Sequence, residues 1–143
     1  MTLTASRHLK LNRFYITDQS ILTKYPAEKQ RVHLDRHSFD LEHEIFRSEE
    51  KDGLFEFLVN LNIKINIEEK PGYVISLGVV GEFTFAKDSE MNDNKEAGYI
   101  LGSALPMVIN SARIYLMQVT AFYPFGAYTL PVVDMGELMK KKE

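Results

Sequence analysis

The most regular pattern in the chain is an alternation of apolar and polar residues over residues 54–67. The apolar positions fall at every second residue: Phe55, Phe57, Val59, Leu61, Ile63, Ile65 and Ile67. A period of two over this length predicts an antiparallel strand with one buried face. The turn sequence of residues 68–72 follows, and the alternation returns over residues 73–85. These two segments are predicted to form a long hairpin.

Two earlier segments, residues 9–22 and 32–46, predict further strands with weaker patterns. In the second segment the apolar positions are first even and then odd: Val32 and Leu34, followed by Phe39, Leu41 and Ile45. One pleated strand cannot bury both sets, so we expect a bulge or break near residues 36–38. The four strands are predicted to form an antiparallel meander, or a variant of one, with one apolar face.

A helical pattern occupies residues 107–122, after a polar loop over residues 88–95 and with Pro106 suited to its first turn. Apolar side chains surround nearly the whole helix: Val108, Ile109, Ala112, Ile114, Tyr115, Leu116, Met117, Val119 and Ala121. A helix that lies on one sheet needs an apolar stripe of little more than 100°. We therefore expect cover on both sides, from its own sheet and from another subunit or a ligand.

Two acidic pairs have the spacing of a helix-capping box. Asp93 with Glu96 predicts a helix start before the long helix, and Asp134 with Glu137 predicts a short last helix. The fold class predicted is α+β: a four-stranded antiparallel sheet packed with a long C-terminal helix and short helices.

Composition places the chain among globular proteins. The 143 residues are 45% hydrophobic and 26% charged, which predicts one domain over residues 1–143. A net charge of -3 gives no basic excess for nucleic acid. The chain has no cysteine and no apolar N-terminal stretch, and its most apolar segment, residues 99–117, contains Pro106, Asn110 and Arg113. These features predict a cytoplasmic protein without membrane insertion.

The sequence nominates no catalytic residue, metal site or cofactor. His33, Asp35 and His37 would share one face of a strand and could chelate a metal, although a solvated strand face is the more ordinary reading. Gly78 and Gly81 enclose no phosphate-loop lysine and predict a bend or bulge instead. We therefore expect that the protein is not an enzyme.

Aromatic residues outside the regular alternation form the more informative set: Phe14, Tyr15, Phe122, Tyr123, Phe125 and Tyr128. Two interpretations are open. The side chains either seal the sheet edge, or they line a groove that holds an extended peptide.

Three stretches carry a resemblance to a known family. They are residues 13–20 (RFYITDQS), residues 101–113 (LGSALPMVINSAR) and residues 122–132 (FYPFGAYTLPV). In this order and spacing they resemble the first strand, helix start and helix-connecting loop of the SecB family of export chaperones. The resemblance implies an ATP-independent holdase that binds unfolded or precursor polypeptides. It also implies a homotetramer, built as a dimer of dimers with helices between the sheets.

The resemblance, together with the apolar excess of the helix, also implies which residues bind clients and which form the oligomer interface. The client-binding groove would contain Phe14, Tyr15, Val32, Leu34, Phe122, Phe125 and Tyr128. The oligomer interface, on the helix, would contain Ile109, Ile114 and Met117.

Contact with the SecA translocase is the part of the resemblance that this sequence matches least. Asp18 stands at one acidic position of the family, but Leu22 and Ser76 stand where further acids are expected. The Lys140-Lys141-Lys142 tail also differs from the family's long acidic tail. A dedicated chaperone of an antitoxin, a small apolar-ligand carrier or enzyme, and an adaptor with one fixed partner are alternatives.

Overall fold

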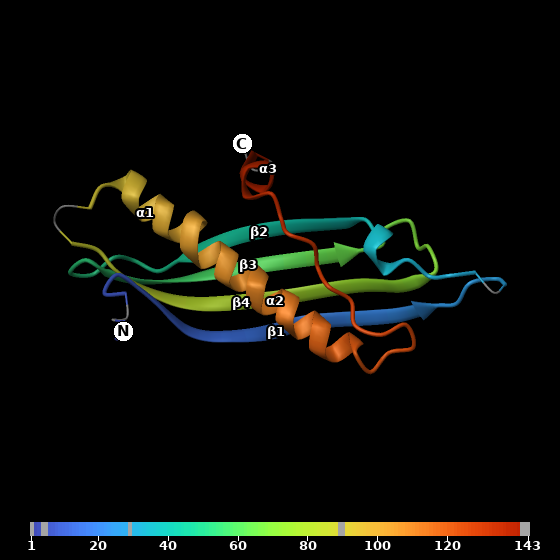
Figure 1. Cartoon of the computed structure of the whole chain (residues 1–143). Helices are drawn as coiled ribbons and strands as arrows, with labels where there is room; N and C mark the ends of the chain where they lie inside the picture. The colour runs from blue at the N-terminus through green and yellow to red at the C-terminus, as the bar shows by residue number, and fades with distance from the viewer. Residues whose placement is uncertain (1, 4–5, 29, 89–90, 141–143) are drawn as a thin grey trace.

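Four antiparallel strands form one sheet in the computed structural model, which describes residues 2–3, 6–28, 30–88 and 91–140. The strands are β1 (Leu9–Lys24), β2 (Phe39–Arg47), β3 (Leu54–Ile65) and β4 (Gly72–Ala86). Their order across the sheet is β1-β4-β3-β2 (Figure 1). The predicted α+β class and the long β3–β4 hairpin are confirmed.

The strand order is a variant of the simple meander. β2, β3 and β4 follow one another as hairpins, while β1 returns along the far side of β4, so that Leu9 pairs with Phe85 and Lys24 with Gly72. Three hairpin strands with a fourth strand laid beside the outer one make a Greek key. Residues 25–38, which connect β1 to β2 and are called the crossover segment below, must therefore span the end of the sheet.

One face of the sheet is buried and the other is open. Directly paired residues share a face, so the register puts the alternating apolar residues of β3 and β4 together under the helix. The largest fully buried side chains on this face are Tyr73, Phe55, Phe57, Phe83, Phe85, Leu61, Ile63, Ile65, Ile75 and Leu77. Figure 1 shows the long helix and the C-terminal segment on this face only.

The second predicted strand begins later than expected. Residues 32–38 are not a strand, and a short 3-10 turn, η1 (Leu34–Arg36), stands where the first half was predicted. The break expected near residues 36–38 is confirmed, because β2 begins at Phe39. Leu34 packs against the core and His37 is buried, so the segment turns its side chains inward without joining the sheet.

The long helix is continuous over Asp93–Thr120 and contains a wider turn in its middle. It consists of α1 (Asp93–Tyr99), a π-helical turn η2 (Ile100–Ala104) and α2 (Leu105–Thr120). Pro106 lies in the first turn of α2, as predicted. A proline has no N–H and its ring collides with the carbonyl four residues earlier, in this case that of Gly102, which explains why the turn before it is widened.

Of the two predicted helix starts, one is wrong by one residue and the other is confirmed. The capping assignment for α1 is wrong by one residue, because the N-cap is Asn92, whose side chain accepts a hydrogen bond from the Lys95 N–H at 2.9 Å. Asp134 does cap α3 (Met135–Lys140), accepting from the Glu137 N–H at 3.1 Å. Of the lysine-rich tail, residues 141–142 lie outside the described residues.

Gly78 and Gly81, which were predicted to mark a bend or bulge, lie at an irregular position and a crowded position of β4. The β1–β4 register shifts between Ile16 and Asp18, which face Val79 and Gly78, and a Cβ on Gly78 would lie 2.7 Å from the Thr17 hydroxyl. A Cβ on Gly81 would lie 2.6 Å from a methyl group of Val108. Gly78 therefore admits a β-bulge in β1, and Gly81 lets α2 lie close to the sheet.

By length and composition alone the helix Asp93–Thr120 could also cross a membrane. A helix that is part of a protein core passes the same test, and Leu105, Val108, Ala112 and Leu116 of this helix are buried against the sheet. The apolar character of this face is thus explained by packing.

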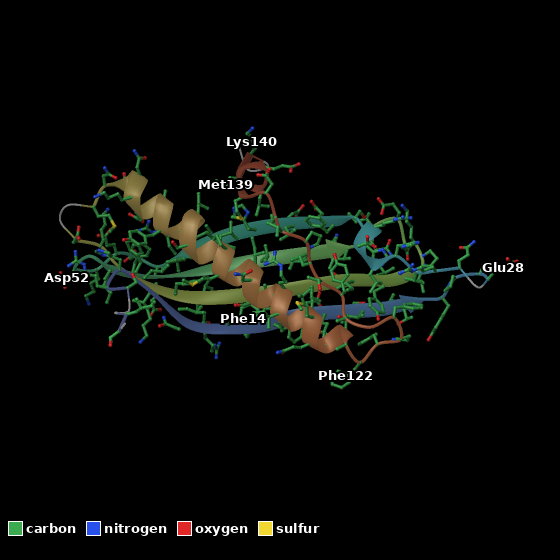
Figure 2. All side chains as sticks on the ribbon, in the orientation of Figure 1. Phe14, Glu28, Asp52, Phe122, Met139 and Lys140 are labelled. Atoms are coloured by element: carbon green, nitrogen blue, oxygen red, sulfur yellow. The ribbon has the colours of Figure 1, made fainter. Side chains whose placement is uncertain are left out.

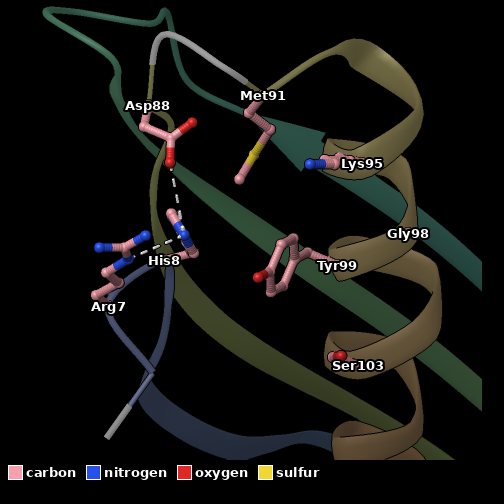
Figure 3. A pocket seen from close by; sticks show the side chains of 8 residues that line it. All are labelled: Arg7, His8, Asp88, Met91, Lys95, Gly98, Tyr99 and Ser103. Carbon is pink, nitrogen blue, oxygen red and sulfur yellow. Dashed lines mark hydrogen bonds and ion pairs between the residues drawn. The ribbon is translucent and has the colours of Figure 1, made fainter.

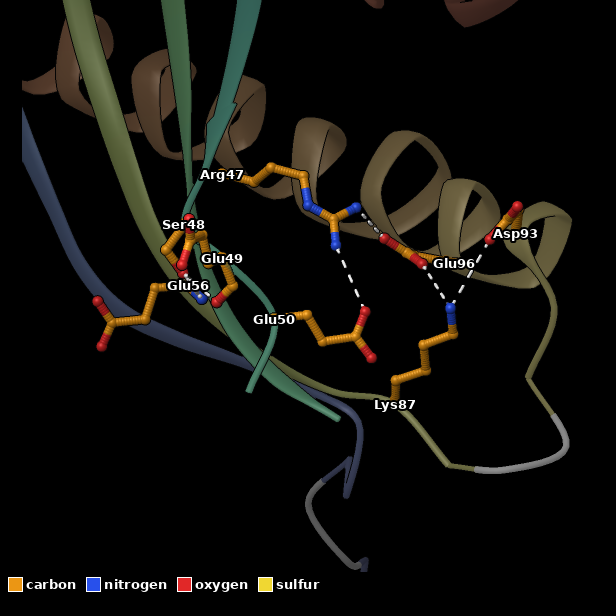
Figure 4. A network of polar contacts seen from close by, with 8 residues as sticks. All are labelled: Arg47, Ser48, Glu49, Glu50, Glu56, Lys87, Asp93 and Glu96. Carbon is orange, nitrogen blue, oxygen red and sulfur yellow. Dashed lines mark hydrogen bonds and ion pairs between the residues drawn. The ribbon is translucent and has the colours of Figure 1, made fainter. Parts of the chain in front are cut away.

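A network of charged side chains fastens α1 to the end of the sheet (Figure 4). The Glu96 carboxylate, 7% exposed, binds the guanidinium of Arg47 on β2 and lies 3.4 Å from Lys87 Nζ. The Arg47 guanidinium also lies 3.9 Å from the ring centre of Phe55. Because Glu96 is buried between two cations, its charge is compensated where it is shielded from water.

Candidate functional site

Aromatic side chains gather where three connections meet at one end of the sheet. Tyr25 of the crossover segment contacts Phe125, with ring centres 5.7 Å apart, and Tyr73 of β4 contacts Tyr123 and Phe125, each at 5.8 Å. Tyr25, Tyr73, Tyr123 and Phe125 are called the aromatic cluster below. The cluster joins the crossover segment to residues 121–134, the post-helix loop between α2 and α3.

The Tyr73 hydroxyl fixes the backbone of the post-helix loop. It donates a hydrogen bond to the Gly126 carbonyl and accepts one from the Phe125 N–H, both at 2.8 Å. Gly126 has a φ of 81°, a conformation that favours glycine. Burial raises the pKa of Tyr73, so its hydroxyl stays neutral and able to donate.

Arg113 of α2 holds the second half of the loop. Its guanidinium donates hydrogen bonds to the Leu130 and Pro131 carbonyls at 2.8 and 2.9 Å. The Tyr128 N–H donates to the Thr120 hydroxyl at 2.7 Å. The loop is therefore attached to the helix and to the sheet by directed bonds, and its exposed side chains are presented from a fixed backbone.

His37 connects the crossover segment to the same cluster. Its Nε2 accepts a hydrogen bond from the Tyr73 N–H at 3.2 Å, and its ring stacks on Tyr128 with centres 6.3 Å apart. Burial, and secondly the charge of Lys70, lower the pKa of His37. Burial also raises the pKa of Tyr128 to about 12. Both side chains are therefore uncharged near neutral pH.

The outer members of this end are exposed. Tyr25 is 70% exposed and Phe122, at the end of α2, is 92% exposed. Figure 2 shows Phe122 projecting from the helix end, away from the ribbon. Two large aromatic side chains in water beside a rigid loop form a surface suited to apolar side chains of a partner.

The predicted groove residues are only partly brought together. Phe125 and Phe122 lie at the aromatic end, but Tyr128 is only 2% exposed and lies beneath the surface. Phe14 and Tyr15 are neighbours on β1 and so point to opposite faces, which contradicts their placement in one groove. Phe14 packs against the core under the helix, whereas the Tyr15 hydroxyl bonds to Glu82 on the open face.

Val32 and Leu34, the remaining groove residues, occupy different depths of the crossover segment. Leu34 packs on the core, and a Cβ on Gly72 would lie 3.2 Å from its side chain. Val32 lines an open pocket of about 230 Å³ between the crossover segment and the β3–β4 turn. His37 also lines this pocket, so the pocket adjoins the aromatic cluster.

The three predicted interface residues do not share one face of α2. Ile114 and Met117 are 56% and 39% exposed on the outer side of the helix, together with Met107 at 41%. Ile109 is 3% exposed because it packs on its own sheet, so the protein's own core already covers it. The expectation of an apolar outer side is met by Met107, Ile114 and Met117.

The residues considered for the translocase contact all lie on the open sheet face. Asp18 is opposite Gly78, Ser76 is opposite Ser20, and Leu22 follows on the same strand face as Asp18. Leu22 is 56% exposed. This part of the open face thus presents one carboxylate, from Asp18.

The expectation that His33, Asp35 and His37 share one face of a strand is wrong, because residues 32–38 form no strand. The His37 side chain is buried, while Asp35 is exposed in η1. Over the described residues no group of three or more histidine, aspartate or glutamate side chains could hold a metal ion.

A larger pocket, of about 470 Å³, lies at the other end of the molecule between the start of β1 and α1 (Figure 3). Arg7, His8 and Asp88 form one wall and Tyr99 with Lys95 the other. The His8 ring lies 3.8 Å from Asp88, and the cations Arg7 and Lys95 line the same pocket. Oppositely charged groups that face each other give the pocket no single sign of charge.

Tyr25, Tyr73 and His37 are site residues that the sequence did not identify as such. Tyr73 has the alternation of a core strand, and its hydroxyl contact depends on a loop 52 residues away. Tyr25 lies between the end of β1 and Pro26, a signal for an exposed turn but not for its partner Phe125.

Comparison with known proteins finds similar structures but no similar sequences. No protein-family model and no curated protein matches the chain. Among solved structures, a SecB-like chaperone of Mycobacterium tuberculosis, in complex with a ChAD peptide from the HigA1 antitoxin, is similar. Its TM-score is 0.57 at 12% identity, over 88% of this chain and 91% of that chain.

A protein of unknown function from Streptococcus agalactiae is also similar, with a TM-score of 0.55 at 12% identity, over 90% of this chain and 100% of that chain. In both cases the likeness extends over nearly all of each chain, and it includes the sheet and the long helix. The resemblance that three short motifs suggest therefore extends to the whole architecture: the chain has the SecB-like fold.

Proposed function

We propose that the protein is an ATP-independent holdase chaperone that binds non-native polypeptides at its aromatic end. The observation that carries the proposal is the exposure of Tyr25 and Phe122, 70% and 92%, beside a loop whose backbone is fixed by hydrogen bonds at Phe125 and Gly126. Exposed aromatic side chains on a rigid frame bury apolar area on a partner with little loss of conformational entropy. The similar mycobacterial chaperone binds a peptide, which agrees with a polypeptide ligand.

The test is protection of a chemically denatured client from aggregation, followed by light scattering without nucleotide. We expect wild-type protein to suppress scattering. We expect Tyr25→Ser/Phe122→Ser to bind clients about 30-fold more weakly and so to require more protein, since two lost aromatic contacts at about 1 kcal/mol each total about 2 kcal/mol. A matched control is Leu22→Ser/Phe46→Ser, which removes two half-exposed apolar side chains from the open sheet face. Absence of protection by wild-type protein at several-fold excess would falsify the proposal.

A dedicated antitoxin chaperone is the second candidate. It is favoured by the complex of the mycobacterial neighbour with an antitoxin peptide. Isolating the protein from cells and identifying the bound polypeptides distinguishes a dedicated antitoxin chaperone from a general holdase. One dominant small partner supports the antitoxin role, and many unrelated precursors support general holding.

We propose that the protein delivers its clients for export and that SecA is its partner in the cytoplasm. Asp18 on the open sheet face is the contact in this proposal. Because Leu22 and Ser76 beside it carry no charge, we expect weak binding that Asp18→Asn abolishes, measured by titration of SecA. Equal binding by wild-type protein and Asp18→Asn argues against this contact.

We further propose a homo-oligomer, a dimer of dimers, that covers the outer side of α2. Burying an exposed Ile or Met side chain contributes about 1.5–3 kcal/mol, so Met107, Ile114 and Met117 together favour association.

A further inference from the structure

The pocket in the crossover segment has one sign of charge. It has a volume of about 230 Å³, and three of the residues that line it are Arg31, Arg36 and Lys70. Among the residues that the structure describes, no aspartate or glutamate lines it. In a chain with a net charge of -3, this is a local concentration of positive charge.

Two acids near this pocket have other partners, while Asp35, which precedes Arg36 and acts electrostatically on His37, is exposed to solvent. Glu68 accepts a hydrogen bond from the Ser38 hydroxyl at 2.6 Å, and Glu69 lies 3.1 Å from Lys24 Nζ. Among the described residues, no carboxylate oxygen lies within 4.0 Å of a side-chain nitrogen of Arg31, Arg36 or Lys70. The three cations thus line the pocket, and none of the described carboxylates is bound to them.

The lining of the pocket also includes apolar and neutral side chains. Val32 and Pro71 line it together with His37, whose pKa is lowered by burial and by Lys70. The Nε2 of His37 is already occupied as the acceptor for the Tyr73 N–H. A ligand therefore meets both cations and hydrocarbon in this pocket, a combination that suits the methylenes and carboxylate of a glutamate side chain.

The pocket adjoins the aromatic cluster through two direct neighbours. Pro26 lines the pocket and follows Tyr25, and His37 lines it and accepts a hydrogen bond from the Tyr73 N–H. An extended segment whose apolar side chains contact the aromatic cluster can therefore place an adjacent side chain in the pocket, because successive residues are only about 3.3 Å apart.

We propose that this basic pocket selects client segments in which an acidic residue stands beside apolar or aromatic residues. The inference rests on the proposed binding of polypeptides at the aromatic end and adds the chemistry by which some segments are preferred. Charge complementarity is the reason for the choice of an acidic peptide as the occupant.

The test uses a fluorescent peptide of about 12 residues, which spans roughly 40 Å when extended. Its sequence is serine and glycine with a phenylalanine and two leucines at the centre, and it is made with glutamate, glutamine or lysine beside the phenylalanine. Affinities are measured by fluorescence anisotropy. We expect the glutamate peptide to bind about fivefold more tightly than the glutamine peptide, and the lysine peptide to bind most weakly.

The variant Arg31→Gln/Arg36→Gln is expected to remove the preference while still binding the glutamine peptide. Lys10→Gln/Lys64→Gln is the matched control, since it removes two exposed cations on the open sheet face. Higher salt is expected to reduce the preference in wild-type protein.

The possible failures are distinguishable. If none of the peptides binds, the proposed function fails. If all three bind equally, or if the control variant loses the preference as well, the pocket does not select clients. If free glutarate displaces the glutamate peptide as strongly as the unlabelled peptide does, the pocket is a small-anion site and the assignment to polypeptides is overturned.

Discussion

At the scale of single residues, two side chains of the aromatic end combine structural and functional roles. The Tyr73 hydroxyl binds both sides of the turn at Phe125 and Gly126, and His37 accepts from the Tyr73 N–H on the other side of the same residue. The crossover segment and the post-helix loop are thus both fixed to one position of β4. A change at this position is expected to alter the binding surface without altering the sheet.

The first expectation concerns the Tyr73 hydroxyl. Tyr73→Phe removes two hydrogen bonds and leaves the Gly126 carbonyl and the Phe125 N–H without this partner, at a cost of about 1–2 kcal/mol in the free energy of unfolding. We expect faster hydrogen exchange in residues 122–128 and weaker protection of clients. Tyr128→Phe is the control, because the buried Tyr128 hydroxyl has no hydrogen-bond partner in the described part of the chain, and its loss is expected to be neutral.

The second expectation concerns pH. Burial lowers the pKa of His37 below its ordinary value of 6.5, so the unfolded chain binds the proton more readily than the folded one. The contribution of His37 to stability is therefore complete above about pH 6.5 and is lost as pH falls from there towards the folded pKa. Asp35 and Glu68 oppose this shift, and Lys70 adds to it.

Denaturant unfolding of wild-type protein and His37→Gln across this range checks the pH expectation. The glutamine amide can accept from the Tyr73 N–H but does not titrate. We expect the stability of the wild type to decrease more than that of the variant on acidification. Parallel curves for the two proteins would show that His37 is not responsible.

At the scale of elements, periodicity in the sequence predicts those parts of the fold that depend on one face. The alternation of β3 and β4 predicts both strands and their hairpin, and Pro106 predicts the start of α2. The register of β1 on β4 and the inward turn of the crossover segment were not predictable in this way. They depend on contacts between residues far apart in the chain, such as Tyr73 with His37.

The candidate site was predictable in composition but not in geometry. The aromatic residues of the post-helix loop were identified from the sequence, yet Phe14 and Tyr15 were placed on one surface although neighbours on a strand point to opposite faces. Arg31, Arg36 and Lys70 come from two segments that meet only in the folded chain.

The attachment of α1 to the sheet gives an expectation at this scale. Lys87 has two acidic partners on α1, Glu96 with 7% and Asp93 with 99% of the side chain exposed. Glu96→Ala leaves Arg47 and Lys87 without this buried partner, and we expect a loss of about 1–3 kcal/mol with faster hydrogen exchange in α1. Asp93→Ala, the matched control at the exposed end, is expected to change stability by less than about 0.5 kcal/mol. Equal effects of the two substitutions would contradict this account of the network.

At the scale of the whole molecule, one side of the sheet is covered, and the exposed apolar side chains include two groups on the covered side. The outer side of α2 carries Met107, Ile114 and Met117, and the aromatic end carries Tyr25 and Phe122. We assign the first to association of subunits and the second to clients. The two assignments are separable because the surfaces lie on different parts of the molecule.

The expectation for assembly follows from that separation. Ile114→Asp places a charge on the outer side of α2, where a covering subunit would bury it without a partner, so we expect smaller species in light scattering. Leu22→Asp is the matched control, since Leu22 and Ile114 are each 56% exposed but Leu22 lies on the open sheet face. An unchanged mass of Ile114→Asp would exclude this face as the interface.

The Greek-key order of the strands has a consequence for synthesis of the chain. β1 leaves the ribosome first, but its partner β4 is made much later; Asn12 bonds to Thr84, 72 residues further on. At about 5–20 residues per second, translation of that interval takes roughly 4 to 14 s. During this time the β1 segment has no sheet to join. A protein proposed to shield incomplete polypeptides must therefore pass through the same unprotected state whenever a new copy of it is made.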